Sequence, residues 1–238
     1  MKNPLRLIFP NKCYCCGKII EENKALCPVC EKNIERIPQK NICDKCGVEK
    51  IYCNCKRNAY SFTSVCAPFY NVGIAKKAFY KYKLNHMEFY FKYFAQQMVM
   101  CFDTYYSNLE FDYIAYVPNS KSHLRERGFD QVKNLAKYIS EQIGIPICDA
   151  IVHSNTGSQR DLNRQNRKKF ITGRFNVNGK VSGRVLLIDD ICTTGATLNE
   201  CTRVLFAAGA GEVYCLTALL GVLNFKGNDN LYKAIGVE

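Results

Sequence analysis

Residues 185–198 have the sequence VLLIDDICTTGATL, which is the most informative motif of the chain. Val185–Ile188 contains no polar residue, which is typical of a strand that other elements cover on both faces of a sheet. The acidic residues Asp189 and Asp190 follow the strand, and a loop of small residues then leads to apolar residues at helical spacing. The stretch therefore predicts a buried strand, a loop and a helix in succession.

The loop of this motif suits a phosphate group. Small residues let backbone N–H groups point at an anion, Gly195 can adopt a conformation that other residues avoid, and the following helix directs its positive end to the same point. Asp189 and Asp190 would repel a phosphate, so we expect both to hold the vicinal hydroxyls of a ribose, with Mg2+ close by. The predicted phosphate ligands are Thr193, Thr194, Gly195, Ala196 and Thr197.

Other nucleotide-binding motifs do not fit this stretch. A P-loop needs a Gly-Lys-Ser/Thr ending and a dinucleotide fold needs the pattern G-x-G-x-x-G, and the stretch has neither. The remaining alternative is an ordinary turn between strand and helix, in which the two acids cap the helix. One acid there would be common, whereas two acids followed by Thr-Thr-Gly-Ala-Thr favour a binding loop.

Strands and helices are expected to alternate along most of the chain. Apolar runs predict strands, and apolar residues at helical spacing predict helices. We expect strands at 61–69, 113–117, 185–188 and 213–220, and helices at 74–106 with a break at Asn85-His86, at 132–143 and at 198–208. This pattern is typical of an α/β fold with a parallel sheet flanked by helices, in which ligands bind at the carboxyl ends of the strands.

The first 60 residues differ in composition from the rest. They hold nine of the 15 cysteines and 12 Lys/Arg against six Asp/Glu, and their apolar stretches are too short for a core of their own. We therefore expect a metal-stapled module at 1–60 and an α/β domain at 61–238. We see no secretory leader and no apolar run of about 18 residues, so we expect a cytoplasmic protein that does not span a membrane.

The cysteines of this module have the spacing of zinc ligands. Two short C-x-x-C turns can present four thiolates to one zinc ion, and in a reducing compartment paired cysteines bind metal more often than each other. A sequential grouping is preferred, while an interleaved grouping or a single occupied site stays open. The predicted ligands are Cys13, Cys16, Cys27 and Cys30 for one ion and Cys43, Cys46, Cys53 and Cys55 for another. Cys192, beside the loop, is expected to be buried rather than nucleophilic.

The motif at 185–198 resembles the thirteen-residue signature of the type I phosphoribosyltransferases. The resemblance implies that the two acids hold the ribose of phosphoribosyl pyrophosphate (PRPP) and that the loop holds its 5′-phosphate. The motif is preceded by a cysteine-rich module, by FYKYK at 79–83, by Val117-Pro118 and by LRERGFDQ at 124–131. Over essentially its whole length the chain is thereby similar to the ComF family of competence proteins, in which a zinc module precedes a phosphoribosyltransferase-like domain.

Basic residues near the end of the strand at 113–117 indicate a second anion site. In the phosphoribosyltransferases the loop after the corresponding strand binds pyrophosphate, and the matching residues here are Pro118, Asn119, Ser120 and Lys121. Arg125 and Arg127 are also expected to bind phosphate, since guanidinium groups pair with it bidentately, although a solvated helix start has the same composition. Lys81, in the run at 79–83, completes the candidate PRPP ligands.

Residues 154–174 are polar and rich in Arg, Lys and Asn, and they lie where the superfamily has a loop that closes over the reaction centre. The ComF pattern is matched by Thr156, Gln159, Leu162 and Arg167. The pattern also has an Arg before Thr156 and an Asn after Arg167, and this chain lacks both. We expect their absence to affect loop closure and turnover more than ligand binding. The alternative is a plain surface loop.

Two functions are expected from the resemblance. The first is a role in DNA uptake during natural transformation, with PRPP bound by the α/β domain and single-stranded DNA bound by the lysines of the zinc module, helped by Tyr14, Tyr52 and Tyr60. DNA-uptake or recombination proteins would then be partners. The alternative is an active phosphoribosyltransferase of nucleobase or nucleotide metabolism with no DNA role, which would release pyrophosphate from PRPP. Zinc is the expected structural cofactor, and Mg2+ is expected with PRPP.

Overall fold

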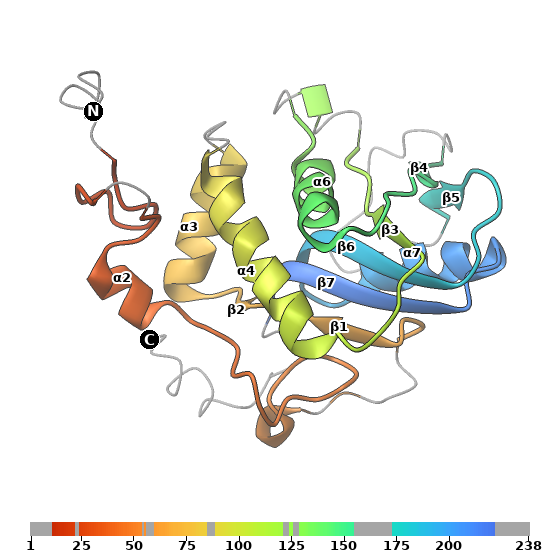
Figure 1. Cartoon of the computed structure of the whole chain (residues 1–238), viewed down its shortest axis with the longest axis horizontal. Helices are drawn as coiled ribbons and strands as arrows, with labels where there is room; N and C mark the ends of the chain where they lie inside the picture. Colours follow the sequence, from red (N-terminus) through yellow and green to blue (C-terminus); the bar gives the residue numbers. More distant parts are fainter. Residues whose placement is uncertain are drawn as a thin grey trace, which may run out of the picture.

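The computed structural model of the chain contains a sheet with helices on both faces and a cysteine-rich segment along one side (Figure 1). It describes residues 11–21, 24–53, 55, 60–84, 89–120, 124–125, 129–154 and 173–221. In the described part, no helix is both long enough and apolar enough to cross a membrane.

The main sheet has five parallel strands, as the alternating pattern predicts. Its strands are β1 (Ser64–Cys66), β2 (Phe69–Tyr70), β3 (Tyr113–Tyr116), β6 (Arg184–Cys192) and β7 (Glu212–Leu220). They lie in the order β1-β7-β6-β3, and β2 also pairs with β7. The α/β fold with a parallel sheet is therefore confirmed.

The strand expected at 61–69 is divided in two. Both β1 and β2 pair with β7 in the same register, with Ser64 opposite Tyr214 and Phe69 opposite Leu219. The interruption falls at Pro68, which has no backbone N–H to donate to a neighbouring strand. A single line of pairing along β7 is thus broken by one proline.

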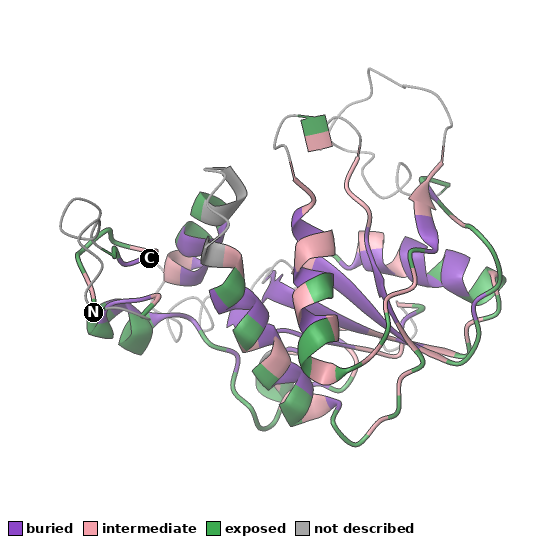
Figure 2. Ribbon diagram, turned by 45° about the horizontal axis from the view of Figure 1, so that its top comes forward, coloured by how far each residue is buried: buried purple, intermediate pink, exposed green. Residues whose placement is uncertain are grey.

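Four long helices flank the sheet: α3 (Gly73–Leu84), α4 (Phe89–Tyr105), α6 (Gln131–Ile143) and α7 (Ala196–Ala207). The side chains of β6 alternate between the two faces, as those of a strand must. Leu186 and Ile188 pack with the apolar residues of α4 and α6, whereas Val185 and Leu187 pack with those of α7. Figure 2 shows the resulting buried strands between helices whose outer surfaces are exposed.

The carboxyl end of β6 extends further than the sequence indicates. The strand was expected to end at Ile188, but β6 continues to Cys192, so Asp189 and Asp190 lie within it. The reason is the length of β7, which pairs with β6 as far as Leu220, whereas β3 stops pairing at Ile188. The prediction that both acids follow the strand is wrong in this respect.

A small antiparallel hairpin was not foreseen. It consists of β4 (Ile151–His153) and β5 (Phe175–Val177), and the segment expected to close over the site connects these two strands. Residues 155–172, including all four ComF-pattern residues named above, lie outside the described part. Three-residue strands contain too few residues for an alternating pattern to stand out, so neither strand could be predicted.

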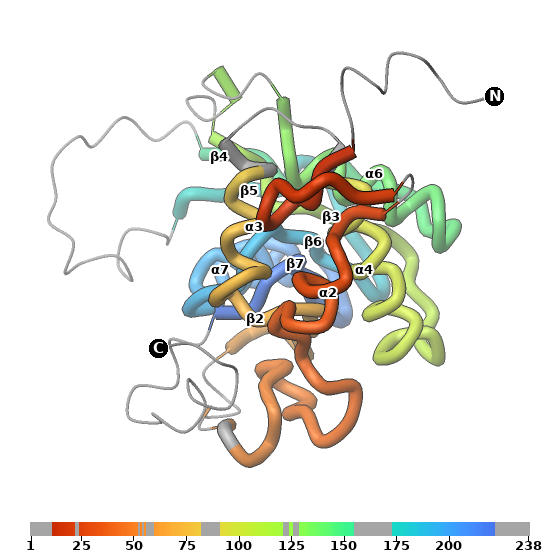
Figure 3. Tube along the Cα trace, turned by 90° about the vertical axis from the view of Figure 1, so that its left-hand side faces the viewer, coloured from red at the N-terminus to blue at the C-terminus, as the bar shows by residue number. Residues whose placement is uncertain are grey.

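The cysteine-rich segment packs on the α/β part through both apolar clusters. Leu26 and Ile34 join the cluster of Phe69 and α4, and Val48 joins the cluster of α7. A short helix, α2 (Pro28–Asn33), and a turn of 3-10 helix at Lys50–Tyr52 lie within the segment. Figure 3 shows it beside α3 and β2. The segment thus covers part of the α/β core.

Candidate functional site: the loop after β6 and the cysteine clusters

The loop after β6 has the geometry of an anion site. Gly195 adopts the left-handed conformation with φ of +73° and is the N-cap of α7, so the first N–H groups of that helix open toward the loop. The side chains of Thr193 and Thr194 are exposed, and Thr194 Oγ1 accepts a 3.4 Å hydrogen bond from the Ala196 N–H. Hydroxyls, backbone N–H groups and the positive end of a helix thus converge at one point.

The two acids beside the loop lie in different surroundings. Asp189 is 6 % exposed, and its carboxylate accepts a 2.8 Å hydrogen bond from the Asp190 N–H. It lies on the same face of β6 as Val185 and Leu187, which is the face that α7 covers. Burial raises the pKa of the Cys201 and Cys215 thiols on this face, and the charge of Asp189 adds to that effect. Asp190 is only partly buried. Of the two, Asp190 is therefore the carboxylate accessible to a ligand.

Cys192 does not have the properties of a nucleophile. Its side chain is buried, and burial together with the charge of Asp189 raises the pKa of its thiol to about 12, against a smaller opposing effect of the Gly195 N–H. A thiol of this kind stays protonated at neutral pH, whereas the thiolate is the reactive form. The geometry thus favours the expected structural role.

A second loop lies at the end of the strand next to β6. Val117 donates a 3.0 Å backbone hydrogen bond to Ile188, and the partly buried residues Pro118, Asn119 and Ser120 follow. Asn119 Nδ2 donates to Asp130 Oδ1 at 2.8 Å, and Asp130 caps α6. The carboxyl ends of β3 and β6 therefore present two neighbouring loops at one edge of the sheet.

One residue of this second loop contacts a histidine that sequence reasoning did not place. His153 Nε2 lies 3.0 Å from the Pro118 carbonyl oxygen, and its ring lies 4.9 Å from that of Phe175. The histidine ends β4, so it joins the base of the hairpin to the loop after β3. The sequence offered no signal for this contact, because the short hairpin was itself not recognised.

The basic candidates are distributed over several places. Arg125 is exposed, and Lys121 and Arg127 lie outside the described part. Lys81 is exposed and donates a 2.6 Å hydrogen bond to the carbonyl of Cys15, in the cysteine-rich segment. The described contact of Lys81 is thus with the cysteine-rich segment rather than with the loop at 193–197.

Eight cysteine sulfurs form two clusters of four. Within each cluster all sulfurs lie within 4.8 Å of one another, and the grouping is the sequential one. The first cluster consists of Cys13, Cys16, Cys27 and Cys30, and the second of Cys43, Cys46, Cys53 and Cys55.

Both clusters fit a zinc ion. Four sulfurs bound tetrahedrally about 2.3 Å from zinc lie about 3.8 Å apart. The observed separations include 3.7 Å between Cys16 and Cys27 and 3.7 Å between Cys43 and Cys55. Burial opposes ionisation of Cys13, yet backbone N–H groups nearby outweigh it and lower the pKa of its thiol to about 6. The donor set is thus the all-thiolate one that structural zinc prefers.

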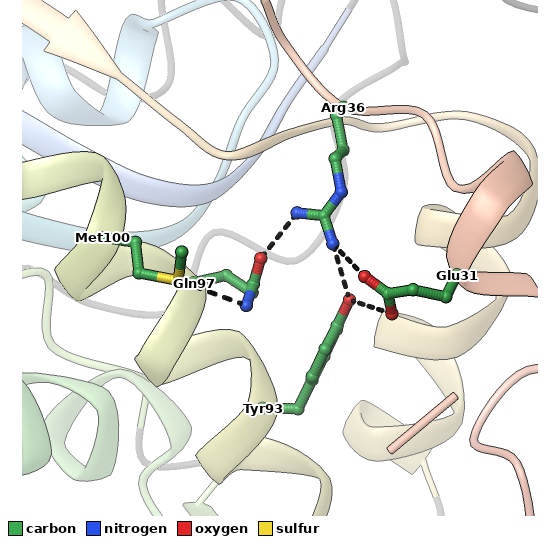
Figure 4. A network of polar contacts seen from close by, with 5 residues as sticks. All are labelled: Glu31, Arg36, Tyr93, Gln97 and Met100. Atoms are coloured by element: carbon green, nitrogen blue, oxygen red, sulfur yellow. Dashed lines mark hydrogen bonds and ion pairs between the residues drawn. The ribbon is translucent and has the colours of Figure 1, made fainter. Parts of the chain in front are cut away.

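The segment between the two clusters is fixed to α4 by a polar network (Figure 4). Arg36 forms an ion pair with Glu31 and donates a 2.6 Å hydrogen bond to Gln97 on α4. The Tyr93 hydroxyl, also on α4, donates to Glu31 at 3.4 Å, and the Arg36 guanidinium lies 5.0 Å from the centre of the Phe69 ring. These contacts hold the linker between the clusters against the α/β part.

Comparisons with known proteins find relatives of the cysteine-rich segment and of most of the chain. Residues 4–67 match the double zinc ribbon domain. The chain is 25 % identical over 224 residues to competence protein ComFC of Streptococcus pneumoniae, covering 85 % of this chain and 96 % of that protein. The chain resembles the ComF competence proteins over most of its length. Its cysteine-rich segment is accordingly a double zinc ribbon with structural zinc, as the clusters indicate.

Other similar proteins cover different shares of the chain. Competence protein F of Haemophilus influenzae is 26 % identical over 217 residues, covering 84 % of this ComF-like chain and 92 % of that protein. DNA utilization protein YhgH of Escherichia coli is 30 % identical over 114 residues, or 46 % of this chain and 50 % of that protein. A crystal structure of adenine phosphoribosyltransferase aligns with 61 % of this chain and 78 % of its own, at a TM-score of 0.40 and 13 % identity.

Proposed function

We propose that the chain binds a 5-phosphoribosyl ligand such as PRPP and acts in DNA uptake. The loop after β6 carries the first part, because exposed Thr193 and Thr194, the left-handed Gly195 and the start of a 12-residue helix meet beside Asp190. Such a point attracts a phosphate, and the adjacent carboxylate can accept hydrogen bonds from sugar hydroxyls. The competence and DNA utilization proteins that the chain resembles support the second part.

The loop after β3 supports PRPP as the ligand in particular. PRPP carries a phosphate at one end of its ribose and a pyrophosphate at the other, so it needs two anion sites a sugar apart. The residues Pro118–Ser120 follow the strand next to β6, at the same edge of the sheet. Mg2+ enters this proposal as the companion of the pyrophosphate and not as a resident ion of the protein.

Calorimetric titration tests the ligand. PRPP with Mg2+, and ribose 5-phosphate alone, should both bind to the wild-type chain. Thr194→Val should weaken both by about tenfold, because a hydrogen bond to a charged group is lost. Thr104→Val, on the exposed surface of α4, is the matched control and should leave both affinities unchanged. Equal affinities for the two variants would contradict the proposed phosphate loop.

The DNA part of the proposal rests on charge rather than on stacking. Tyr14 packs edge-on against Tyr93 with ring centres 6.5 Å apart, and Tyr60 stacks on Phe62 at 4.8 Å, so neither ring matches the free stacking surface expected for bases. The side chain of Tyr52 lies outside the described part. The proposed contacts to the DNA phosphates are therefore the exposed lysines of the zinc ribbons, namely Lys12, Lys18, Lys24, Lys32, Lys40 and Lys50.

Binding of a fluorescent oligothymidine tests this part. Its logarithmic affinity should fall with the logarithm of salt concentration with a slope of about −0.7 for each phosphate contacted. Replacing Lys18 and Lys50 by Gln should flatten that slope, while Lys137→Gln on α6 should not. A salt-independent affinity would remove the electrostatic basis of the proposal.

An active transferase with no DNA role is the second candidate, and the neighbouring loops after β3 and β6 favour it. In that case a nucleobase would displace pyrophosphate from C1 of the ribose. Pyrophosphate release, measured by a coupled assay with each common nucleobase, distinguishes the candidates. Release by a chain that does not bind DNA would favour the transferase.

A further inference from the structure

The loop at 193–197, called the phosphate loop below, packs on Tyr60, which precedes the first strand of the sheet in sequence. A Cβ atom added to Gly195 would lie only 2.8 Å from Tyr60 Cε1 and 3.6 Å from Phe62 Cε1. Tyr60 and Phe62 stack on each other with ring centres 4.8 Å apart and an interplanar angle of 16°. The two rings therefore form one wall against which the backbone of the loop is packed, and the glycine is needed for this close approach as well as for its left-handed conformation.

The same short segment, residues 60–62, is also attached to α7. The Ser61 N–H donates to Asn199 Oδ1, and the Asn199 N–H donates a 2.8 Å hydrogen bond to the Gly195 carbonyl. Gly195 is thus held from two sides, by the rings of the segment and by the first turn of the helix. A displacement of residues 60–62 would therefore displace Gly195 as well.

The second zinc cluster packs against this segment from the other side. Lys45 lies between two zinc ligands, and its Nζ donates to the Phe62 carbonyl. The Lys45 carbonyl in turn accepts a 3.2 Å hydrogen bond from the Val65 N–H of β1. A Cβ on Gly47 would lie 2.3 Å from the Val65 carbonyl oxygen, so the zinc-binding turn sits directly on β1. The turn, the segment 60–62 and the sheet edge form one packed unit.

The two zinc clusters differ in this respect. Cys43 and Cys46 belong to the apolar cluster that also contains Phe62 and Cys192, whereas Cys13 and Cys27 belong to the cluster on the opposite face, with α3 and α4. A small cavity of about 10 Å³ is lined by Cys46 of the second cluster, by Tyr60 and by Thr193 of the phosphate loop. In the described part, only the second cluster therefore shares a packed region with the loop.

We propose that the second zinc site sets the conformation of the phosphate loop through Tyr60, whereas the first zinc site does not. Tyr60 acts as a positioning residue, because its ring packs on the backbone of the loop at Gly195. Zinc at the second site fixes the turn at Lys45, the turn fixes segment 60–62, and the segment holds Gly195 in the conformation that opens its N–H groups to an anion. The effect on ligand affinity rests on the proposed function, while the effect on the loop itself does not.

Four variants of the full-length chain test the proposal. Tyr60→Ala removes the wall and keeps both zinc sites, and Tyr60→Phe keeps the ring. Cys55→Ser impairs the second site and Cys16→Ser the first, so these two are matched controls for each other. Each variant is measured for zinc content, for calorimetric affinity toward ribose 5-phosphate, and for hydrogen exchange of the backbone amides at 193–199.

Tyr60→Ala should retain the zinc content of the wild type, exchange its loop amides faster and bind ribose 5-phosphate about tenfold more weakly. Tyr60→Phe should restore both properties. Cys55→Ser should have the same loop defects as Tyr60→Ala, and Cys16→Ser should not. If Cys55→Ser does not fold, the two Tyr60 variants decide.

The proposal would be overturned if Tyr60→Ala had the amide exchange rates and the ribose 5-phosphate affinity of the wild type. It would also be overturned if Cys55→Ser and Cys16→Ser changed the exchange of the loop amides equally. If wild-type protein does not bind ribose 5-phosphate at all, the proposed ligand is wrong, yet the exchange comparison still tests the coupling between zinc and the loop.

Discussion

The Asp190 N–H donates a 2.8 Å hydrogen bond to the carboxylate of Asp189, so the two acids of the motif are not equivalent. Asp189 is buried against the α7 face of the sheet and is satisfied in part by its own neighbour, while Asp190 is partly exposed beside the loop. We therefore expect Asp189 to order the end of the strand and Asp190 to contact the ligand. The sequence had suggested the same role for both.

This difference predicts different effects of the two amide substitutions. Asp190→Asn should weaken PRPP binding by about ten- to a hundredfold with little change in melting temperature, because a hydrogen bond to a charged group contributes about 1.5–3 kcal/mol. Asp189→Asn should instead lower the stability of the fold, because it changes a buried group that accepts a backbone N–H. Calorimetry and thermal melts of both variants check this, and the reverse pattern would contradict the assignment.

A second prediction concerns Cys192. Its buried thiol, with a pKa raised to about 12 by burial and by Asp189, should resist alkylation by iodoacetamide at pH 8 in folded, zinc-loaded protein. The exposed Cys16 should become reactive once a chelator removes zinc, which gives an internal control. Mass spectrometry of labelled peptides measures both. Rapid labelling of Cys192 without unfolding would show that the thiol is more accessible and more acidic than described.

A third prediction concerns the contact between the ribbon linker and α3. The buried Glu35 accepts backbone hydrogen bonds of 3.0 Å from Ile74 and 2.9 Å from Ala75, and so caps the start of that helix. Glu35→Ala should lower the free energy of unfolding by about 1–2 kcal/mol, whereas Glu35→Gln keeps an acceptor and should lose less. Urea denaturation followed by circular dichroism measures both. Equal losses would mean that side-chain packing rather than capping is responsible.

A fourth prediction concerns pH. The hydrogen-bonded ion pair with Arg203 lowers the pKa of Glu200, whose carboxylate also accepts a 2.6 Å hydrogen bond from the Gly173 N–H. Since the folded-state pKa lies below the unfolded one, the stabilisation is present above the ordinary glutamate pKa of about 4.3 and is lost as pH falls through the lowered value. The stability difference between wild type and Glu200→Gln should therefore shrink in melts taken from pH 6 down to pH 3. A difference that does not change with pH would contradict the ion pair.

The sequence predicts the parallel sheet well because its strands are buried and apolar. The run at 185–188 and the helical spacing at 132–143 leave little choice of structure, and Gly144 ends α6 in the left-handed conformation with φ of +74°, as expected. The sequential grouping of the zinc ligands was preferred over an interleaved one, and the structure has the sequential grouping.

Other features depend on contacts between distant residues and so escaped prediction. The carboxyl end of β6 is set by how far β7 continues beside it, which no local pattern records. The packing of Tyr60 on Gly195 joins residues far apart in sequence, and a tyrosine near a cysteine pair reads equally well as a stacking surface for bases. The burial of Asp189 likewise depends on α7, which follows the loop in sequence and covers the face of the sheet on which Asp189 lies.

A phosphoribosyl ligand is expected to bind where β6 meets α7. A crystal structure of the full-length protein grown with PRPP and Mg2+ tests it most directly. Density for the 5′-phosphate is expected against the N–H groups of residues 195–197, with the ribose hydroxyls at Asp190. Ligand density at any other place, or an ordered loop without ligand in crystals soaked at saturating PRPP, would contradict it.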